Sequence, residues 1–474
     1  KKVSKISYAI FYLFSQLLSQ VPFLEIRPYA PPNFEQYSVS HSVDHHFPYT
    51  NQADDVFLRF DGTEFTENLL YPNCLSGSSC YDGHAGVDYY MPLNNPILAP
   101  ASGYVLWASF SPAADPCPGG ITPNGDQGTI IVAHGNGYYT VYLHMNEPLN
   151  VSVGDNVIVG DTLGFNGNTG CAINAHLHFE IRKDNWFFDS NDPYVVDPFG
   201  WWNDSTDPIE IIRNNRSEWL WVSSHLVDDG DNGFQRFNGP DWAYLNVGFN
   251  GDSWTAPATQ NMSDSRHYSI WVPYIEQSSD HNIEIYIPPG VEASTEAIYE
   301  LKIKNENGLS SVTNIVVNQN ATPGFFQTIE TVFLPSGYNC SIILRDVVGS
   351  SSIGANVVFD AIRFSPVTSS IDEKDNSRII IPNGVGITSV SPNPFNSSTR
   401  IKYNIKRGGD ILIHILDLYG QSVAIYENKN QLAGEYFFDW SGQTDYGFNV
   451  SSGVYFFSVS LNGMNSTRKL IYLK

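Results

Sequence analysis

The distribution of apolar and polar residues along this chain predicts β-strands almost throughout. Runs rich in Val, Ile, Tyr and Phe recur, and Asn-Gly and Asp-Gly pairs separate them. A period of two places successive side chains on opposite faces of a strand. The clearest alternation spans residues 176–182, where one face carries His176, His178, Glu180 and Arg182 and the other carries Leu177, Phe179 and Ile181. We therefore expect an all-β protein with a strand that presents two imidazoles on one face.

The chain is long enough for several domains, since a domain usually takes roughly 100–200 residues. Three lysines followed by a short apolar run predict a signal peptide, and no other segment is apolar enough to predict a membrane span in the mature protein. The expected segments are a signal peptide at 1–20, an N-terminal extension at 24–70, a first domain with a Trp-rich tail at 71–222, a second domain at 223–365, a linker at 366–387 and a third domain at 388–474.

Charge and cysteine content narrow the class of protein. The formal net charge is −24, which argues against nucleic-acid binding through basic patches. Five cysteines are present and none lies in a CxxC motif, so a cysteine zinc site is not expected. We expect a disulfide between Cys74 and Cys80, a second pairing of Cys117 with Cys171, and one free thiol.

A set of metal-binding residue types occurs in the first domain. His84 and Asp88 lie four residues apart, which places both on one side of an extended segment, and His178 can join them from another strand. Two histidines and a carboxylate, with a fourth position open to water, form the ligand set of a catalytic zinc site. His144 and His176 lie on what alternation predicts to be the polar faces of their strands, Tyr142 sharing the face of His144. Either histidine could take a proton from water or stabilise an oxyanion.

Residues 71–200 resemble the LytM/lysostaphin-type zinc endopeptidases. The matching motifs are His84-x-x-x-Asp88, Tyr142-x-His144 and His176-x-His178. The resemblance implies an antiparallel-sheet peptidase domain with one Zn²⁺ per chain, bound by His84, Asp88 and His178. It further implies that His144 and His176 are the catalytic pair, that Tyr81 helps to bind substrate at the oxyanion, and that the substrate is peptidoglycan or a glycine-rich peptide.

Two other resemblances concern the rest of the chain. Residues 223–365 resemble golvesin carboxy-terminal-like domains, at motifs such as Val227-Asp-Asp-Gly-Asp-Asn-Gly-Phe and Phe359-Asp-Ala-Ile-Arg-Phe, and residues 388–474 resemble a type IX secretion sorting domain, beginning at Ser391-Pro-Asn-Pro-Phe. Both resemblances imply β-sandwiches. The second implies the type IX secretion machinery as a partner and a secreted or cell-surface protein of a Bacteroidota-like bacterium.

Several alternatives stay open at this point. His41-Ser-Val-Asp-His-His46 could be a second metal cluster, although we expect a solvated loop. His134 is expected to be structural, and Trp242 and Trp254 are expected in a core rather than stacked on sugar rings. The alternative function is a catalytically silent envelope-binding or activator module.

Overall fold

The computed structural model describes most of the chain in the following segments: 22–31, 36–46, 56–66, 83–117, 122–186, 194–213, 216–237, 242–305, 308, 310–352, 355–367, 385–405, 408–417, 422–444, 447–461 and 464–473. The chain divides into two compact units, residues 1–368 and 369–474. The expected signal peptide at 1–20 and most of the expected linker at 366–387 lie outside the described residues. The expected all-β class is confirmed, because antiparallel sheets make up both units.

An antiparallel sheet in the first unit carries the motifs singled out above. Its strands follow the order β4-β11-β8-β7-β6-β9, with β10 joined to β8, β5 joined to β10, and β12 joined to β11. The bounds are β4 Val87–Tyr90, β5 Pro96–Leu98, β6 Gly103–Ser111, β7 Gln127–Ala133, β8 Tyr138–Asn146, β9 Asn156–Val157, β10 Thr162–Asn166, β11 His176–Lys183 and β12 Val195–Val196. A helix, α3 (Pro208–Arg213), follows.

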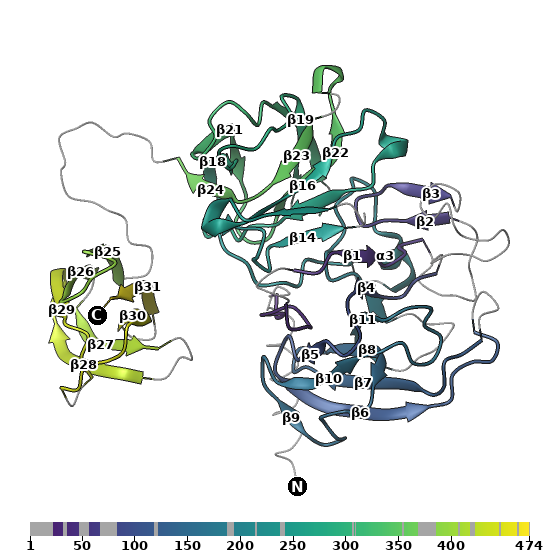
Figure 1. The fold of residues 1–474 in the computed structure, drawn as a ribbon, viewed down its shortest axis with the longest axis horizontal. Coiled ribbons are helices and arrows are strands. Elements are labelled where there is room, and N and C mark those ends of the chain that lie inside the picture. Colours follow the sequence, from purple (N-terminus) through teal and green to yellow (C-terminus); the bar gives the residue numbers. More distant parts are fainter. Residues whose placement is uncertain are drawn as a thin grey trace, which may run out of the picture. The chain divides into compact units, whose positions relative to one another are not determined.

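The N-terminal segment contributes a strand to this sheet. Strand β1 (Val39–His41) pairs antiparallel with β4, and Val39 also pairs in parallel with Phe237 of β14 (Phe234–Phe237). Figure 1 shows β1 between these two strands. Strand β1 therefore connects the sheet that carries the histidines with the sheet that follows it. A separate hairpin joins β2 (Val56–Leu58) to β3 (Glu64–Thr66).

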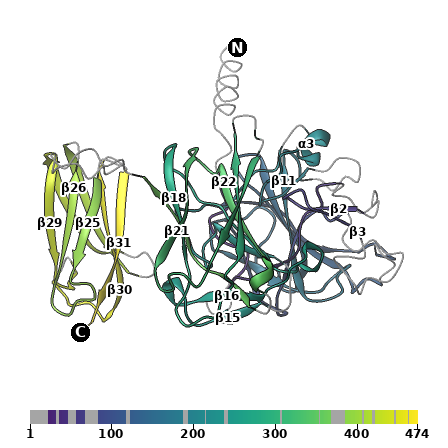
Figure 2. The same cartoon turned by 90° about the horizontal axis from the view of Figure 1, so that it is seen from above.

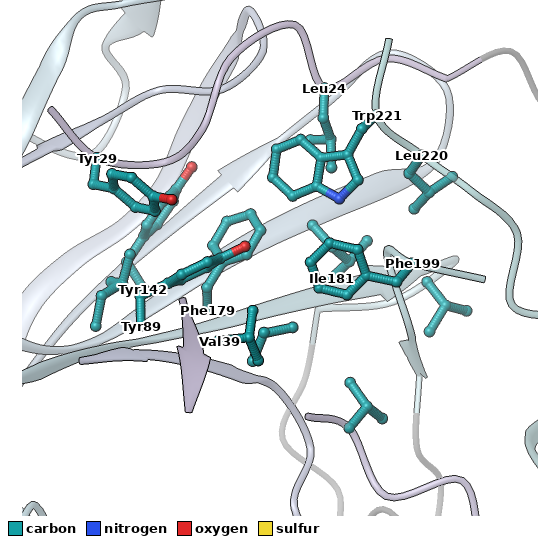
Figure 3. Packing of buried hydrophobic residues seen from close by; sticks show 14 of the residues in the cluster. Leu24, Tyr29, Val39, Tyr89, Tyr142, Phe179, Ile181, Phe199, Leu220 and Trp221 are labelled. Carbon is teal, nitrogen blue, oxygen red and sulfur yellow. The ribbon is translucent and has the colours of Figure 1, made fainter. Parts of the chain in front are cut away.

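The core beneath the histidine-bearing strands is rich in aromatic residues. Phe179 of β11 lies directly opposite Tyr142 of β8, and both are fully buried. Tyr89, Phe199 and Trp221 pack into the same cluster (Figure 3). Leu177, Phe179 and Ile181 all belong to this cluster, so the predicted apolar face of residues 176–182 is confirmed.

The remainder of the first unit consists of further β-sheets around a second core. Strands β20-β19-β22-β17-β14 continue from β1, a second sheet has the order β13-β24-β18-β21, and a third has the order β15-β16-β23. The remaining bounds are β13 Leu226–Val227, β15 Ala243–Leu245, β16 Ser253–Pro257, β17 Tyr268–Trp271, β18 Ser279–Tyr286, β19 Ala297–Lys304, β20 Ser310–Val317, β21 Phe326–Leu334, β22 Cys340–Val348, β23 Asn356–Phe359 and β24 Ile362–Pro366, with short 3₁₀ helices η3 Phe249–Gly251, η4 Met262–Asp264 and η5 Ser350–Ser352. Trp254 is buried in this core and Trp242 packs against it, as expected, and Cys340 is a buried free thiol.

The second unit is a sandwich of two sheets. One sheet has the order β25-β26-β29 and the other β28-β27-β30-β31. Figure 2 shows β25, β26 and β29 of the first sheet beside β30 and β31 of the second. The alternating residues of both enclose one cluster that includes Ile401, Ile413 and Phe457. The bounds are β25 Val385–Ser391, β26 Thr399–Ile405, β27 Gly409–Leu416, β28 Ser422–Gln431, β29 Gly434–Trp440, β30 Gly453–Leu461 and β31 Met464–Tyr472. Across the described residues of both units, no helix is long and apolar enough to cross a bilayer.

Candidate active site

The three expected metal ligands meet at one point between β4 and β11. His178 Nδ1 lies 2.9 Å from Asp88 Oδ1 and 3.1 Å from His84 Nε2, and His84 Nε2 lies 3.3 Å from Asp88 Oδ1. Register explains the meeting, because His178 pairs directly with Asp88 across the two strands. Ligands about 2.1 Å from a tetrahedral zinc lie about 3.4 Å apart, so this triangle has nearly the size that zinc requires. The three residues fit the ion that the sequence predicts.

A close approach of the backbone makes room for one of these ligands. A Cβ atom on Gly86 would lie 2.7 Å from His178 Nε2 and 2.9 Å from the carbonyl oxygen of Phe179. Such distances are shorter than a van der Waals contact, so any larger residue would displace the imidazole. Position 86 therefore requires glycine, because a side chain there would occupy the space of the His178 imidazole.

Electrostatics favour a positive charge inside the triangle. Burial acts to raise the pKa of Asp88, but the imidazoles around it outweigh burial and hold that pKa well below its usual range. Burial acts to lower the pKa of His178, but hydrogen bonds with Asp88 and Glu180 outweigh burial and raise it to about 9. A site that stabilises a proton in this way also suits a metal cation that replaces the proton.

A second carboxylate orients His178 from the other side of the ring. Glu180 Oε1 lies 3.1 Å from His178 Nε2, and Glu180 Oε2 accepts a hydrogen bond of 2.6 Å from Arg182 Nε. This arrangement leaves Nδ1 of His178 for the metal and assigns the proton to Nε2. Sequence reasoning gave Glu180 no role, although its place two residues after His178 on the same face was a sufficient signal.

The N-terminal extension supplies outer contacts that sequence reasoning missed. The carbonyl oxygen of Ser42 lies 2.8 Å from His84 Nδ1, which directs Nε2 of His84 toward the triangle. His41 Nδ1 lies 3.3 Å from Asp88 Oδ2, the carboxylate oxygen that faces away from His84 and His178. No local pattern could reveal these contacts, because they depend on the pairing of β1 with β4 across the sequence.

His144 reaches the site by a route that differs from the prediction. Simple alternation would place it on the face of Tyr142, but Tyr142 is buried against Phe179 in the core. His144 has a φ of 61°, in the left-handed region that residues other than glycine rarely adopt. This backbone irregularity ends the alternation, and the ring of His144 lies with its centroid 4.7 Å from that of His176. The expectation of a shared polar face with Tyr142 was wrong.

The two expected catalytic histidines are oriented in the same manner. The carbonyl oxygen of Thr169 lies 2.8 Å from Nδ1 of His144, and that of Asn174 lies 2.8 Å from Nδ1 of His176. Each Nδ1 therefore carries the proton, and each Nε2 is left as an acceptor. His176 Nε2 lies 3.8 Å from Asp88 Oδ1, beside the triangle. Burial and the imidazoles of His176 and His178 lower the pKa of His144 to about 3, so His144 is neutral at pH 7.

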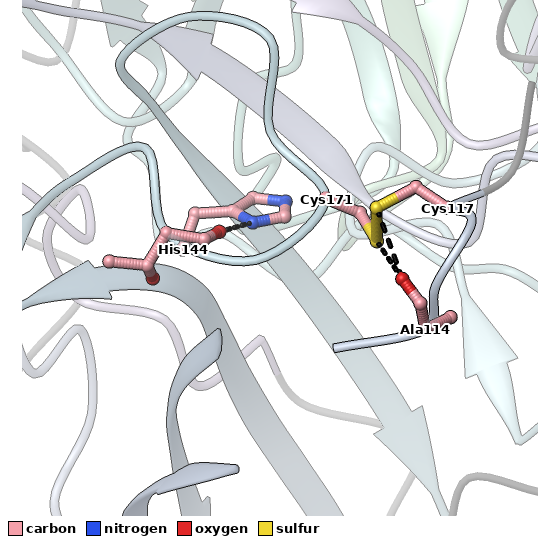
Figure 4. The surroundings of a disulfide bond; sticks show 5 residues. Ala114, Cys117, His144 and Cys171 are labelled. Atoms are coloured by element: carbon pink, nitrogen blue, oxygen red, sulfur yellow. Dashed lines mark hydrogen bonds between the residues drawn. A yellow bond between two sulfur atoms is a disulfide. The ribbon is translucent and has the colours of Figure 1, made fainter. Parts of the chain in front are cut away.

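A disulfide lies close to this histidine pair. Cys117 and Cys171 are joined, with their Cα atoms 5.5 Å apart, which confirms the second expected pairing. The bond ties the segment before β7 to the loop that leads into β11, and both sulfur atoms lie near the carbonyl of Ala114 (Figure 4). The loops beside His144 are thereby linked covalently.

The remaining predicted residues have different outcomes. Tyr81, Cys74 and Cys80 lie outside the described residues, so substrate binding by Tyr81 and the pairing of the two cysteines stay predictions. His134 is structural as expected, since its ring nitrogens lie 2.9 Å from the carbonyl oxygen of Ser102 and 3.0 Å from Thr140 Oγ1.

The expectation of a solvated loop for residues 41–46 was wrong. His45 is fully buried and lies between Asp197 and Asp207, with nitrogen–oxygen distances of 3.1 and 2.9 Å. Asp44 is also buried, where it accepts hydrogen bonds from the backbone of Leu58 and Gly83. The segment fills an interior position because the side chains of Asp44 and His45 both have partners there.

Two segments of the chain match models of known protein families. Residues 82–190, which include the three expected metal ligands and the two expected catalytic histidines, match the model described as peptidase family M23. The chain carries an M23 metallopeptidase domain. Residues 389–473 match the secretion system C-terminal sorting domain, so the expected sorting domain is confirmed as well. The golvesin-like resemblance of residues 223–365 stays a prediction.

Relatives of the M23 domain are bacterial peptidases. The chain is 33% identical over 98 residues to peptidoglycan DD-endopeptidase ShyA of Vibrio cholerae, which covers 21% of this chain and 20% of ShyA. It is 29% identical over 145 residues to glycyl-glycine endopeptidase ALE-1 of Staphylococcus capitis, which covers 30% of this chain and 32% of ALE-1. The chain thus spans a third or less of these curated relatives.

A solved structure is also similar to this chain. It is the catalytic domain of the antimicrobial peptidase lysostaphin from Staphylococcus simulans, with 28% identity and a TM-score of 0.21. The similarity covers 27% of this chain and 82% of the lysostaphin domain.

Replacing His41 tests whether the N-terminal segment acts on the metal site. We expect His41→Ala to weaken zinc binding and to lower kcat/KM, each by about 10–100-fold, because the Asp88 carboxylate loses the imidazole that fixes its orientation. Competition with a chromophoric chelator measures the affinity.

His41→Gln should recover part of the loss, since its amide can donate a hydrogen bond to Asp88. His134→Ala, an equivalent truncation in the same unit, is the matched control and should leave the affinity unchanged. Wild-type zinc affinity in His41→Ala would refute this role.

Proposed function

We propose that the M23 domain is a zinc endopeptidase that hydrolyses peptide bonds in peptidoglycan cross-links or in glycine-rich peptides. The observation that carries the proposal is the triangle of His84, Asp88 and His178, with donor atoms 2.9 to 3.3 Å apart and two further imidazoles beside it. The names of ShyA and ALE-1 support both classes of substrate.

His84, Asp88 and His178 would hold the zinc ion, and His144 and His176 would handle protons. When bound, zinc acts as a Lewis acid that polarises a peptide carbonyl and acidifies water. The Nε2 atoms of His144 and His176, which their Nδ1 hydrogen bonds leave as acceptors, can accept a proton from the attacking water and later return it to the leaving amine. As imidazolium, either residue can also stabilise the oxyanion. The carbonyl oxygens of Thr169 and Asn174 keep both rings oriented for these steps.

The location of the enzyme bears on its substrate. The sorting domain at 389–473 indicates secretion or attachment to the cell surface. We infer export by the type IX machinery of a Bacteroidota-like bacterium, to the outside of the outer membrane. The cell's own wall lies inside that membrane, so we propose the peptidoglycan of other bacteria, or a glycine-rich protein, as the substrate.

Digestion of purified walls tests this function. We expect the zinc-loaded protein to release soluble peptides from the peptidoglycan of several bacteria, including walls with glycine bridges, and mass spectrometry should locate new amino termini at cleaved peptide bonds. Removal of the metal with a chelator should stop the release, and one equivalent of Zn²⁺ should restore it.

Two results would contradict the proposal. Protein that contains no zinc and cleaves no wall would favour the catalytically silent module. Products from the producer's own wall alone would favour remodelling of the cell's own envelope over attack on other bacteria.

A further inference from the structure

A second group of buried acidic residues lies in the part of the first unit that follows the M23 domain. Asp228 and Asp229 come directly after β13, and Asp360 lies between β23 and β24. Strand β13 pairs antiparallel with β24, with Val227 opposite Ile362, and this pairing brings the two turns together. One carboxylate oxygen of each aspartate lies within 4.8 Å of the other two, and all three residues are buried.

The hydrogen-bond partners of this cluster are all neutral. Asp228 accepts hydrogen bonds from the side chain of Asn250 and from the backbone of Asp229, at 2.7 and 3.0 Å. Asp360 accepts from the backbone of Phe249 and from that of Ala361. Among the described residues, no lysine, arginine or histidine forms an ion pair with any of the three carboxylates. The hydrogen bonds to Asp228 and Asp360 therefore come from neutral amide groups.

Asp229 is the aspartate of this cluster whose surroundings indicate that a cation binds there. The residue is 1% exposed, and neither of its carboxylate oxygens has a hydrogen-bond partner. Arg236 lowers the pKa of Asp229, but its guanidinium stacks 3.3 Å above the ring of Trp254 and forms no hydrogen bond to Asp229. A carboxylate buried without a partner is costly, and buried charges are as a rule paired or bound to a metal.

Burial and mutual repulsion act in the same direction in this cluster. Burial, together with the charges of Asp228 and Asp252, raises the pKa of Asp229 to about 8. Burial is also the main cause that raises the pKa of Asp360 to about 9. A bound cation would remove this penalty, because its charge compensates the carboxylates.

We propose that Asp228, Asp229 and Asp360 bind one divalent cation, and that this cation is Ca²⁺. Calcium takes oxygen ligands at 2.3–2.6 Å, so oxygens up to about 5 Å apart can share one ion. The cluster offers only oxygen donors, which disfavours zinc, and a buried cage of protein groups suits calcium better than the strongly hydrated magnesium. The ion would fasten the turn after β13 to the junction of β23 and β24.

A luminescent lanthanide offers a direct test, because a tryptophan adjoins the cluster. Trp271 Nε1 donates a hydrogen bond of 3.0 Å to the backbone carbonyl of Asp360. We expect Tb³⁺, added to the zinc-loaded full chain, to emit when tryptophan is excited, and excess Ca²⁺ to quench this emission. Calorimetric titration with Ca²⁺ should show one binding event beyond the zinc site, and Ca²⁺ should raise the unfolding temperature of the first unit.

Variants separate this site from the acidic surface and from the zinc site. Asp229→Asn should lose the Tb³⁺ emission and the thermal shift, while the protein without Ca²⁺ should be at least as stable as wild type, because one buried charge is gone. Asp280→Asn, a matched change at an exposed position, should keep both responses. His178→Ala should also keep both, so failure of the proposed peptidase function would leave this result unaffected.

The proposal is wrong if Ca²⁺ changes neither emission nor unfolding temperature, or if Asp229→Asn responds as wild type does. Should Asp229→Asn fail to fold, Asp360→Asn provides the same comparison. A response to Mg²⁺ or Mn²⁺ equal to that to Ca²⁺ would overturn the choice of ion.

Discussion

Replacing His178 with alanine is expected to abolish both zinc binding and peptide-bond cleavage. His178 Nδ1 lies 2.9 and 3.1 Å from the other two ligand atoms, so its loss opens one side of the triangle. A catalytic metal supplies several kcal/mol of transition-state stabilisation, and each 1.36 kcal/mol is tenfold in rate, so activity should fall by about three orders of magnitude or more. Zinc per chain is measured by atomic spectroscopy, and activity is measured by release of wall peptides.

The control for this variant is another buried histidine of the same unit. His134 bonds through both ring nitrogens and lies outside the site, so His134→Ala should lower thermal stability but keep one zinc ion per chain. Circular dichroism should show β structure in both variants. Full wall lysis by a zinc-free His178→Ala protein would show that the ligand set has been misassigned.

Replacing His144 with alanine is expected to separate catalysis from metal binding. General acid–base catalysis contributes about 10²- to 10⁴-fold, so kcat should fall by that factor with little change in KM. Zinc content should stay at one per chain, because His144 is not a corner of the triangle. Kinetics on a synthetic glycine-rich peptide, with zinc analysis of the same samples, measure both quantities.

His176→Ala serves as the companion variant. His144 and His176 face each other with ring centroids 4.7 Å apart, so we expect both single variants to keep zinc and to lose kcat. If the two residues act on the same proton transfer, kcat of the double variant should be only slightly lower than kcat of the less active single variant. Loss of zinc from His144→Ala would instead make His144 a ligand.

Much of the metal site follows from short-range sequence pattern. The alternation over residues 176–182 does place His178 with Glu180 and Arg182 on one face and three core residues on the other. A strand dictates this result by its own geometry, because successive side chains point to opposite faces whatever the strand pairs with. The spacing of His84 and Asp88 is local as well, so the ligand types and their motifs could be recognised before any fold was known.

Other parts of the site depend on contacts between distant segments. The face of His144 is set by a left-handed backbone position that periodicity does not reveal, and Tyr142 beside it lies in the core. The roles of His41 and Ser42 arise because β1 pairs with β4, which lies more than forty residues later in the chain. The polar sequence of residues 41–46 predicted a solvated loop. The segment is buried instead, because His45 forms ion pairs with Asp197 and Asp207, which lie far along the chain.

The sequence by itself predicted the all-β class and the sorting domain, and it supplied the proposed ligand and catalytic residue types. These predictions rest on composition, on the alternation of apolar and polar residues, and on motifs that resemble known families. Each of these features can be recognised within a short stretch of sequence. Only the tertiary structure decided that His41 and Ser42 contact the proposed metal ligands and that the ring of His144 lies beside that of His176. It also decided that Asp228 and Asp229 lie next to Asp360. Those arrangements come from strand pairing and burial between remote segments, where the free energy of a polar group depends on neighbours that its own sequence does not specify.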